Sequence, residues 1–234
     1  MSLTDELLRP HLSSPAKPLV THYDDATGAR VELSVTTLVN WAAKTANWLV
    51  EEPEVEPGEP VAVALPSHWQ TAGVLLGAWW CGAHVVTEAA GAKVAFTGPG
   101  TTSSEAELTA VVSLDPMGRG LPNAPGAGAV DFLSDARTAG DTYSPLFPAD
   151  RDTPALCSST VDEVLAQARS YAEKDGISSG DRVLSTVEWA LPEGALRGLV
   201  APLLAGASLV QVSNPDPAKL ADRGGTERTT LTLS

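Results

Sequence analysis

The sequence predicts an α/β protein with largely parallel, helix-covered sheets, because it contains two copies of a strand–helix–strand pattern. The first copy runs over residues 58–86 and the second over residues 180–212. In each copy a short apolar run is followed by a helical repeat of apolar residues, a glycine and a second apolar run. A short connection of this kind joins two parallel strands through a right-handed crossover. The similarity of the two copies has two interpretations. It reflects either an internal repeat, which gives two similar βαβ lobes, or the general similarity of all strand–helix–strand units.

The first unit contains the most regular pattern of the chain. Its Val-rich run at residues 60–66 ends in proline, which is typical of a buried strand. Ser67 is expected to cap the helix that follows, and Gly82 to end it. One face of this helix carries residues at three- and four-residue spacing: Trp69, Ala72, Leu76 and Trp80. The adjacent Trp79 and Trp80 point in different directions, so we expect one of them to be partly exposed.

The remaining elements alternate between helix and strand along nearly the whole chain. Turn residues at 24–28 separate two alternating segments, so a β-hairpin is expected over residues 19–33. Further strands are expected at residues 93–97, 109–114, 154–157 and 229–233. Further helices are expected at residues 3–10, 34–51, 131–139, 161–174 and 215–222, with a short one capped by Ser103. The segment Ser144–Asp150 predicts a boundary within one domain of residues 1–234, between lobes at about 19–146 and 150–234.

Composition narrows the functional classes. The chain has 234 residues, of which 43% are hydrophobic and 19% charged, as in soluble globular proteins. Its formal net charge of −14 argues against binding to nucleic acid or to an anionic membrane, because both require clustered Lys and Arg. The N-terminus lacks the basic start and apolar core of a signal peptide, and no apolar run is long enough to span a membrane. Cys81 and Cys157 lie outside any CxxC pair, so we expect buried free thiols in a reducing compartment and a cytoplasmic protein.

Several segments follow one another in the order of a known family. They are Val31–Ser34, Val55–Pro66, Gly82–Ala83, Pro154–Leu156, Ser179–Ser185, Leu203–Ala207 and Arg228–Leu231. Their order resembles the N-terminal domain of the adenylate-forming superfamily, which comprises acyl- and aryl-CoA synthetases, luciferases and the adenylation domains of peptide synthetases. The resemblance extends from about residue 19 to the C-terminus. More narrowly, the chain resembles short stand-alone proteins of actinobacterial type that are similar to this truncated lobe.

The resemblance implies an ATP site that this sequence does not complete. Enzymes of the superfamily carry a loop of the form T-S-G-T-T-G-x-P-K-G after the strand that matches Ala155–Cys157, and its backbone and lysine surround the ATP phosphates. Here Ser158, Ser159 and Thr160 follow that strand, with no Gly, Pro or Lys before Tyr171. The family's residues for adenine, ribose and Mg²⁺, and its C-terminal domain with a lysine, lie further downstream. We expect this chain to lack them as well.

Ser158, Ser159 and Thr160 form the candidate site for an anion or nucleotide, because hydroxyl groups at a helix start suit a phosphate or a carboxylate. The alternative is an ordinary helix cap, in which Thr160 and Glu163 form a capping box. Residues 98–102 and Ser103-Ser104 offer related features, which we interpret as a turn and a cap. The chain's histidines are scattered, so we expect no metal site: His11, His22, His68 and His84.

We therefore expect a non-catalytic adenylate-forming scaffold that acts by binding a ligand or another protein, without a cofactor. The alternative is an AMP-forming carboxylic acid ligase, similar to acyl-CoA synthetases, that uses ATP and CoA through an unrecognised loop or a second chain. Six tryptophans on or beside the helices that cover the sheets allow a third interpretation. In that interpretation the chain associates with itself or with another protein through them, and the alternative is packing between the lobes.

Overall fold

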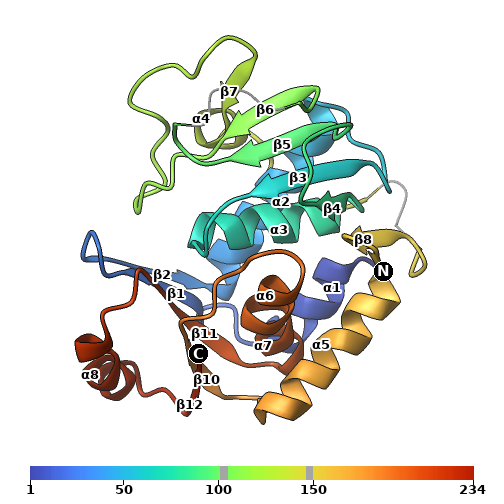
Figure 1. Cartoon of the computed structure of the whole chain (residues 1–234). Coiled ribbons are helices and arrows are strands. Elements are labelled where there is room, and N and C mark those ends of the chain that lie inside the picture. The colour runs from blue at the N-terminus through green and yellow to red at the C-terminus, as the bar shows by residue number, and fades with distance from the viewer. Residues whose placement is uncertain (101–104, 146–149) are drawn as a thin grey trace.

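The protein contains two sheets, with helices between them and on their outer sides (Figure 1). The computed structural model describes residues 1–100, 105–145 and 150–234. Helices α2 (Val35–Glu51) and α3 (Trp69–Trp80) lie between the two sheets (Figure 1). One hydrophobic cluster joins both sheets to these helices, and it includes Leu209 from one sheet, Phe96 from the other and Leu38 from α2. The predicted class, α/β with mostly parallel sheets, is confirmed.

The larger sheet contains the first predicted strand–helix–strand unit. Among the described residues it has seven strands in the order β7-β6-β5-β3-β4-β8-β9. They are β3 (Pro60–Ala64), β4 (His84–Val86), β5 (Val94–Thr97), β6 (Leu108–Val111), β7 (Ala129–Asp131), β8 (Pro154–Leu156) and β9 (Ser159–Thr160), and α4 (Phe132–Ala136) follows β7. Neighbouring strands are parallel except for the β8–β9 hairpin. Val61 pairs with Val85 across β3 and β4, so α3 connects two adjacent parallel strands as expected.

The smaller sheet contains the second unit. Its order within the described residues is β12-β10-β11-β1-β2. The strands are β1 (Pro18–Asp24), β2 (Ala29–Ser34), β10 (Arg182–Ser185), β11 (Ser208–Ser213) and β12 (Leu231–Leu233). Helix α6 (Glu193–Ala195), a π-helical turn (Leu196–Val200) and α7 (Ala201–Ala205) connect β10 to β11. The other helical segments are α1 (Leu3–Leu8), a 3₁₀ turn (Arg9–His11), α5 (Val161–Asp175) and α8 (Pro217–Glu227).

The two sheets are not made from consecutive halves of the chain. Strands β1 and β2 come from the N-terminal region and pair beside β11, whereas β8 and β9 come from the later region and extend the larger sheet. The predicted boundary at Ser144–Asp150 falls between α4 and β8. Residues 146–149 lie outside the described residues, as do Thr101, Thr102 and the predicted cap at Ser103-Ser104. The division into lobes stays a prediction.

The cap of α3 is His68 and not Ser67, so that prediction was wrong. His68 Nδ1 accepts the backbone N–H of Gln70 at 3.2 Å. The Ser67 hydroxyl is occupied elsewhere, because it accepts the backbone N–H of Trp189 at 2.7 Å and donates to Glu188 at 3.2 Å. Glu188 and Trp189, which follow β10, therefore hydrogen-bond to the Ser67 hydroxyl that the local sequence pattern predicted would cap α3.

Four of the six tryptophans are buried inside the protein: Trp48, Trp69, Trp79 and Trp189. Trp79 donates its indole N–H to the carbonyl of Ala155 at 2.9 Å. Trp80 is half-buried and donates to Asp5 at 3.1 Å. The prediction that one member of the adjacent pair is partly exposed is confirmed.

Two further predictions concern the state of the cysteines and the presence of a membrane-spanning helix. Both cysteines are free thiols; Cys81 is buried, whereas Cys157 is half-buried in the turn after β8, where its φ is +50°. Burial raises the pKa of the Cys81 thiol to about 12. Within the described residues, no helix combines the length and apolar character needed to cross a membrane.

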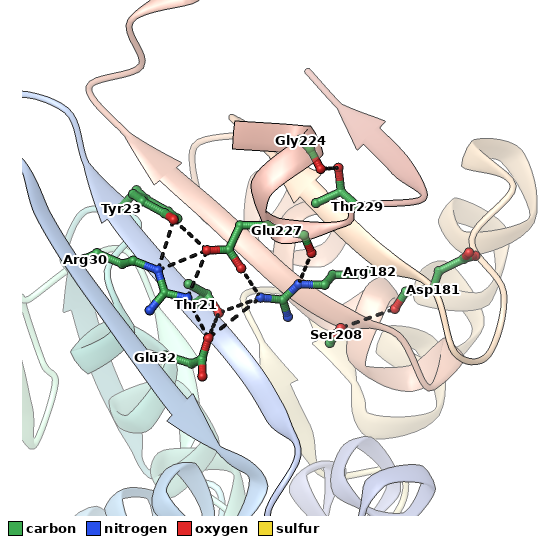
Figure 2. Close-up of polar contacts among 10 residues, drawn as sticks. All are labelled: Thr21, Tyr23, Arg30, Glu32, Asp181, Arg182, Ser208, Gly224, Glu227 and Thr229. Atoms are coloured by element: carbon green, nitrogen blue, oxygen red, sulfur yellow. Dashed lines mark hydrogen bonds and ion pairs between the residues drawn. The ribbon is translucent and has the colours of Figure 1, made fainter. Parts of the chain in front are cut away.

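A polar network on the smaller sheet fastens the end of α8 (Figure 2). The Glu227 side chain is 6% exposed, and it accepts hydrogen bonds from the Tyr23 hydroxyl, from Arg30 Nε at 3.0 Å and from Arg182. Burial opposes ionisation of this carboxyl, but the three hydrogen bonds outweigh it and lower the Glu227 pKa to about 2. A buried carboxylate with two guanidinium partners therefore holds β1, β2, β10 and α8 together.

Candidate functional site

A crevice opens where strands of both sheets end at their carboxyl edges. Strand β1 ends at Asp24, β11 ends at Ser213, and β3 leads into residues 65–68. These ends surround a cavity of about 230 Å³. It is lined by His22, Asp24, Thr27, Ala29, Pro66, Ser67, His68, Leu114, Pro116, Glu188, Ser213 and Asn214. The carboxyl ends of strands are the usual place for ligands in open α/β sheets, so this crevice is the candidate site.

Two buried histidines meet in the crevice. His22 lies on β1 and is 2% exposed, and His68 caps α3 and is 7% exposed. Their ring centroids are 4.5 Å apart and the rings meet edge to face at 71°. Burial lowers the pKa of His22 to about 4, although the nearby Asp24 carboxylate acts in the opposite direction. Burial, together with His22, lowers the pKa of His68 to about 3. Both rings are therefore neutral at pH 7.

Hydrogen bonds assign the proton of each neutral ring. The Ser213 hydroxyl donates to the carbonyl of Ser67, and its oxygen lies 3.0 Å from His22 Nε2. His22 on β1 therefore donates from Nε2 to Ser213 on the neighbouring β11, and the Ser213 hydroxyl in turn connects this sheet to the segment that follows β3 of the larger sheet. His68 Nδ1 accepts from the Gln70 backbone N–H, which leaves the His68 proton on Nε2. The His68 Nε2–H makes no hydrogen bond with any residue that the structure describes, and the ring lines the cavity.

The walls of the crevice are fixed by contacts that span the chain. Asp24 accepts hydrogen bonds from the Asn214 side chain at 2.8 Å, from the Thr27 hydroxyl at 2.8 Å and from the Ala26 backbone N–H at 3.0 Å. Burial alone would raise the Asp24 pKa, but these hydrogen bonds outweigh it and lower the pKa. Asp24 is thus an ionised group in a hydrogen-bonded turn, and Asn214, the residue that follows β11, also contacts it.

The loop after β6 closes the crevice on the side of the larger sheet. Leu114 has a φ of +56°, and its backbone N–H donates to the Gln70 side chain at 2.9 Å. The Gln70 amide in turn donates to the carbonyl of Asp115 at 2.8 Å. Gln70 is 3% exposed, so one buried side chain seats this loop against the start of α3.

The predicted site at Ser158, Ser159 and Thr160 lies at a different place in the fold. Ser158 and Ser159 belong to the turn and the short strand after β8, and Thr160 is the N-cap of α5. None of the three lines the crevice. The capping box with Glu163, which was the alternative interpretation, is present: Thr160 accepts the Glu163 N–H, and the Glu163 carboxylate accepts the Thr160 N–H at 2.9 Å.

The first backbone N–H groups of α5 donate within the chain. Val161 donates to the carbonyl of Thr153 and Asp162 to the carbonyl of Arg151, both at 3.1 Å, and Glu163 donates to the Thr160 hydroxyl at 3.3 Å. The first turn also carries two carboxylates, Asp162 and Glu163. A helix start attracts an anion through free N–H groups and a positive field, and here both are already engaged.

Sequence reasoning missed the crevice. It treated His22 and His68 as scattered, whereas the structure brings them into contact. No group of three or more His, Cys, Asp or Glu side chains among the described residues is placed to hold a metal ion. A usable signal was available in the sequence, since both histidines lie at the carboxyl ends of predicted strands.

Comparison with known sequences finds one protein that matches the chain over nearly its whole length. A "TIGR03089 family protein" of Mycobacterium tuberculosis is 43% identical over 241 residues, which cover 99% of this chain and 96% of that protein. Comparison with models of protein families finds no match.

Solved structures of ligases share the fold. An acyl-CoA synthetase from Brucella canis matches 99% of this chain with a TM-score of 0.78 and 19% identity. An acetoacetyl-CoA synthetase from Streptomyces lividans matches all of it with a TM-score of 0.77 and 17% identity, and a benzoate CoA ligase from Burkholderia xenovorans matches 99% with a TM-score of 0.75 and 19% identity. The chain spans 42–50% of the length of these three proteins. Identities this low show the fold alone.

Proposed function

This chain belongs to the TIGR03089 protein family, and we propose that it is a ligand-binding protein on the scaffold of an acyl-CoA synthetase N-terminal domain, without adenylation activity of its own. The observation that carries the proposal is the turn after β8. It passes from Leu156 to the helix at Val161 in four residues, two of which form β9. The ligand site in this proposal is the crevice that contains His22 and His68.

Adenylation requires positive groups around the phosphates of ATP, because negative charge develops on the reacting phosphoryl group. Arg151 is a cation beside the start of α5, and it is already paired with two carboxylates. Its guanidinium contacts Asp162 at 2.9 Å and also Glu6. A triphosphate at this turn would have to displace both partners and approach Glu163. These contacts support a role without ATP chemistry.

The experiment is pyrophosphate exchange into ATP with a panel of carboxylic acids. We expect no exchange above that of a heat-denatured sample. A thermal-shift measurement with ATP, AMP and CoA accompanies it, because a ligand at 100 times its dissociation constant adds about 2.7 kcal/mol to stability. We expect no shift with any of the three. Exchange that persists after repurification, and is lost when Ser158, Ser159 and Thr160 are all changed to Ala, would overturn the proposal.

The second candidate is an AMP-forming carboxylic acid ligase completed by a second chain. It is favoured by one observation, that solved ligases of this fold are about twice as long as this chain. In that case ATP or CoA alone should already stabilise the isolated chain. A mass measurement in dilute solution tests self-association, and a strict monomer would leave only a different protein as the completing chain.

A further inference from the structure

His68 caps α3 with the ring nitrogen that a second proton would occupy. Its Nδ1 accepts the backbone N–H of Gln70 at 3.2 Å, and the single proton of the neutral ring lies on Nε2. Protonation of His68 therefore occurs at Nδ1, where it directs an N–H group at the N–H of Gln70. It also adds a positive charge at the N-terminal end of a 12-residue helix, where the helix dipole is already positive. The charged form of His68 thus cannot act as the cap.

A second imidazole faces His68 where the two sheets meet. His22 comes from β1 of the smaller sheet, and its ring meets the His68 ring edge to face, with centroids 4.5 Å apart. Both residues are buried, so a charge on either ring would lose its contact with water. Charges on both rings would also repel each other at this separation. The contact between the rings is therefore stable only while they are neutral.

Two carboxylates line the same crevice as the histidines. Asp24 ends β1 and Glu188 follows β10, and none of the described residues that line the crevice is Lys or Arg. The Asp24 carboxylate favours protonation of both rings, but burial outweighs it and lowers the pKa of His22 to about 4 and that of His68 to about 3. The hydrogen bonds that lower the pKa of Asp24 keep this carboxyl ionised at pH 5 and above. It therefore offsets only part of the cost of a buried imidazolium.

Ser67, the residue before His68, connects the segment after β3 to the smaller sheet. Its hydroxyl accepts the backbone N–H of Trp189 at 2.7 Å, and its carbonyl accepts the hydroxyl of Ser213. His22 Nε2 lies 3.0 Å from the same Ser213 hydroxyl oxygen. A movement of His68 away from Gln70 and His22 therefore disturbs the hydrogen bonds that join the two sheets at the crevice.

We propose that the neutral His22–His68 pair holds the crevice closed at pH 7, and that protonation of the pair opens the crevice in mildly acidic solution. The inference rests on the proposed function, because it names how access to the same site is regulated. In the open crevice both rings reach water, where the pKa of a histidine is about 6.5. That pKa is higher than in the closed crevice, so the closed form is fully stable above pH 6.5 and loses stability as the pH falls toward 4. Between pH 7 and pH 5 the equilibrium constant for opening should rise about 500-fold if both rings contribute and about 20-fold if one does.

Amide hydrogen exchange of the full chain, measured by NMR at pH 7 and at pH 5 without a ligand, tests this proposal. The reporters are the backbone N–H groups of Gln70 and Trp189, which bond to His68 and Ser67. We expect their protection factors, which correct for the intrinsic pH dependence of exchange, to fall about 500-fold between the two pH values. A fall of less than about 20-fold at both reporters would overturn the proposal.

Variants of three histidines separate opening of the crevice from unfolding of the whole chain. His68→Asn keeps an N-cap, and His22→Gln keeps an N–H donor for Ser213, so each removes one titrating ring. In either variant the fall in protection should shrink to about 20-fold. His11→Gln is the matched control, because burial also lowers the His11 pKa, but His11 contacts the carbonyl of Leu203 and does not line the crevice. We expect His11→Gln to keep the fall seen in the wild type. A reduction as large as in the crevice variants would show that acid unfolds the whole chain, and would contradict the proposal.

The two proposals fail in different ways. Pyrophosphate exchange together with the expected loss of amide protection would defeat the proposed lack of adenylation and leave the regulation of the crevice intact. Amide protection at Gln70 and Trp189 that does not change with pH, without pyrophosphate exchange, would defeat the regulation and leave the proposed lack of adenylation intact.

Discussion

The ionised Glu227 carboxylate, which accepts hydrogen bonds from Tyr23, Arg30 and Arg182, should make a pH-dependent contribution to stability (Figure 2). Its pKa falls from an ordinary value of 4.5 to about 2 in the folded protein. At about 1.36 kcal/mol per pKa unit, ionised Glu227 contributes about 3 kcal/mol to stability at pH 7. The pKa is lower in the folded state than in the unfolded state, so this contribution is complete above pH 4.5 and is lost as the pH falls toward 2. At a pH of about 3.5, about 2 kcal/mol should remain.

Urea unfolding of Glu227→Gln and of the wild type, at pH 7 and at pH of about 3.5, measures this contribution. We expect the variant to be about 3 kcal/mol less stable than the wild type at pH 7, because Arg182 and Arg30 lose their shared carboxylate. The difference should narrow to about 2 kcal/mol at pH 3.5. Glu32→Gln is the control: Glu32 contacts the same Arg30 but its side chain is 36% exposed, so the loss should stay below about 1 kcal/mol. If the difference in unfolding free energy between Glu227→Gln and the wild type is the same at both pH values, Glu227 does not have the lowered pKa that these contacts imply.

Two further predictions concern helix packing and capping. Gly77→Ala should lower stability by about 2 kcal/mol, because the added Cβ would overlap Thr45 and lie 2.7 Å from the carbonyl oxygen of Ala42, whereas Gly225→Ala, in open space on α8, should raise stability by up to about 1 kcal/mol. Thermal unfolding of both variants measures these changes, and equal effects would exclude close packing of α2 on α3. Thr160→Val should lower stability by about 1 kcal/mol, because it removes the N-cap of α5, and we expect ATP to cause no thermal shift in the variant or in the wild type. A thermal shift with ATP that the wild type shows and the variant lacks would instead indicate a phosphate site at Thr160.

Most helices and strands could be predicted because their signals are local. The apolar spacing of α3 and the Val-rich run of β3 each depend on a few neighbouring residues, and both elements appear where they were expected. The short connection after β8 could also be read directly from the chain. The hydrogen bonds from the first N–H groups of α5 to the carbonyls of Arg151 and Thr153 could not be predicted, because these bonds depend on how the preceding turn folds back.

The candidate site depends on contacts between distant segments. His22 reaches the crevice because β1 pairs with β11, which places His22 opposite Gln211 in the register. Nothing near His22 in the sequence specifies that partner. The error at Ser67 has the same origin, since its hydroxyl is engaged by Trp189 from a later strand–helix connection. Local rules assign a serine before a helix to the cap, and here a long-range hydrogen bond prevails.

We propose that the turn after β8 does not bind a triphosphate, and a crystal of the full chain soaked in ATP and magnesium would show this. We expect the Thr160–Glu163 capping box and the Arg151–Asp162 ion pair to remain intact and no ordered phosphate to lie at the start of α5. Phosphates ordered beside Cys157, with Arg151 turned toward them, would contradict it.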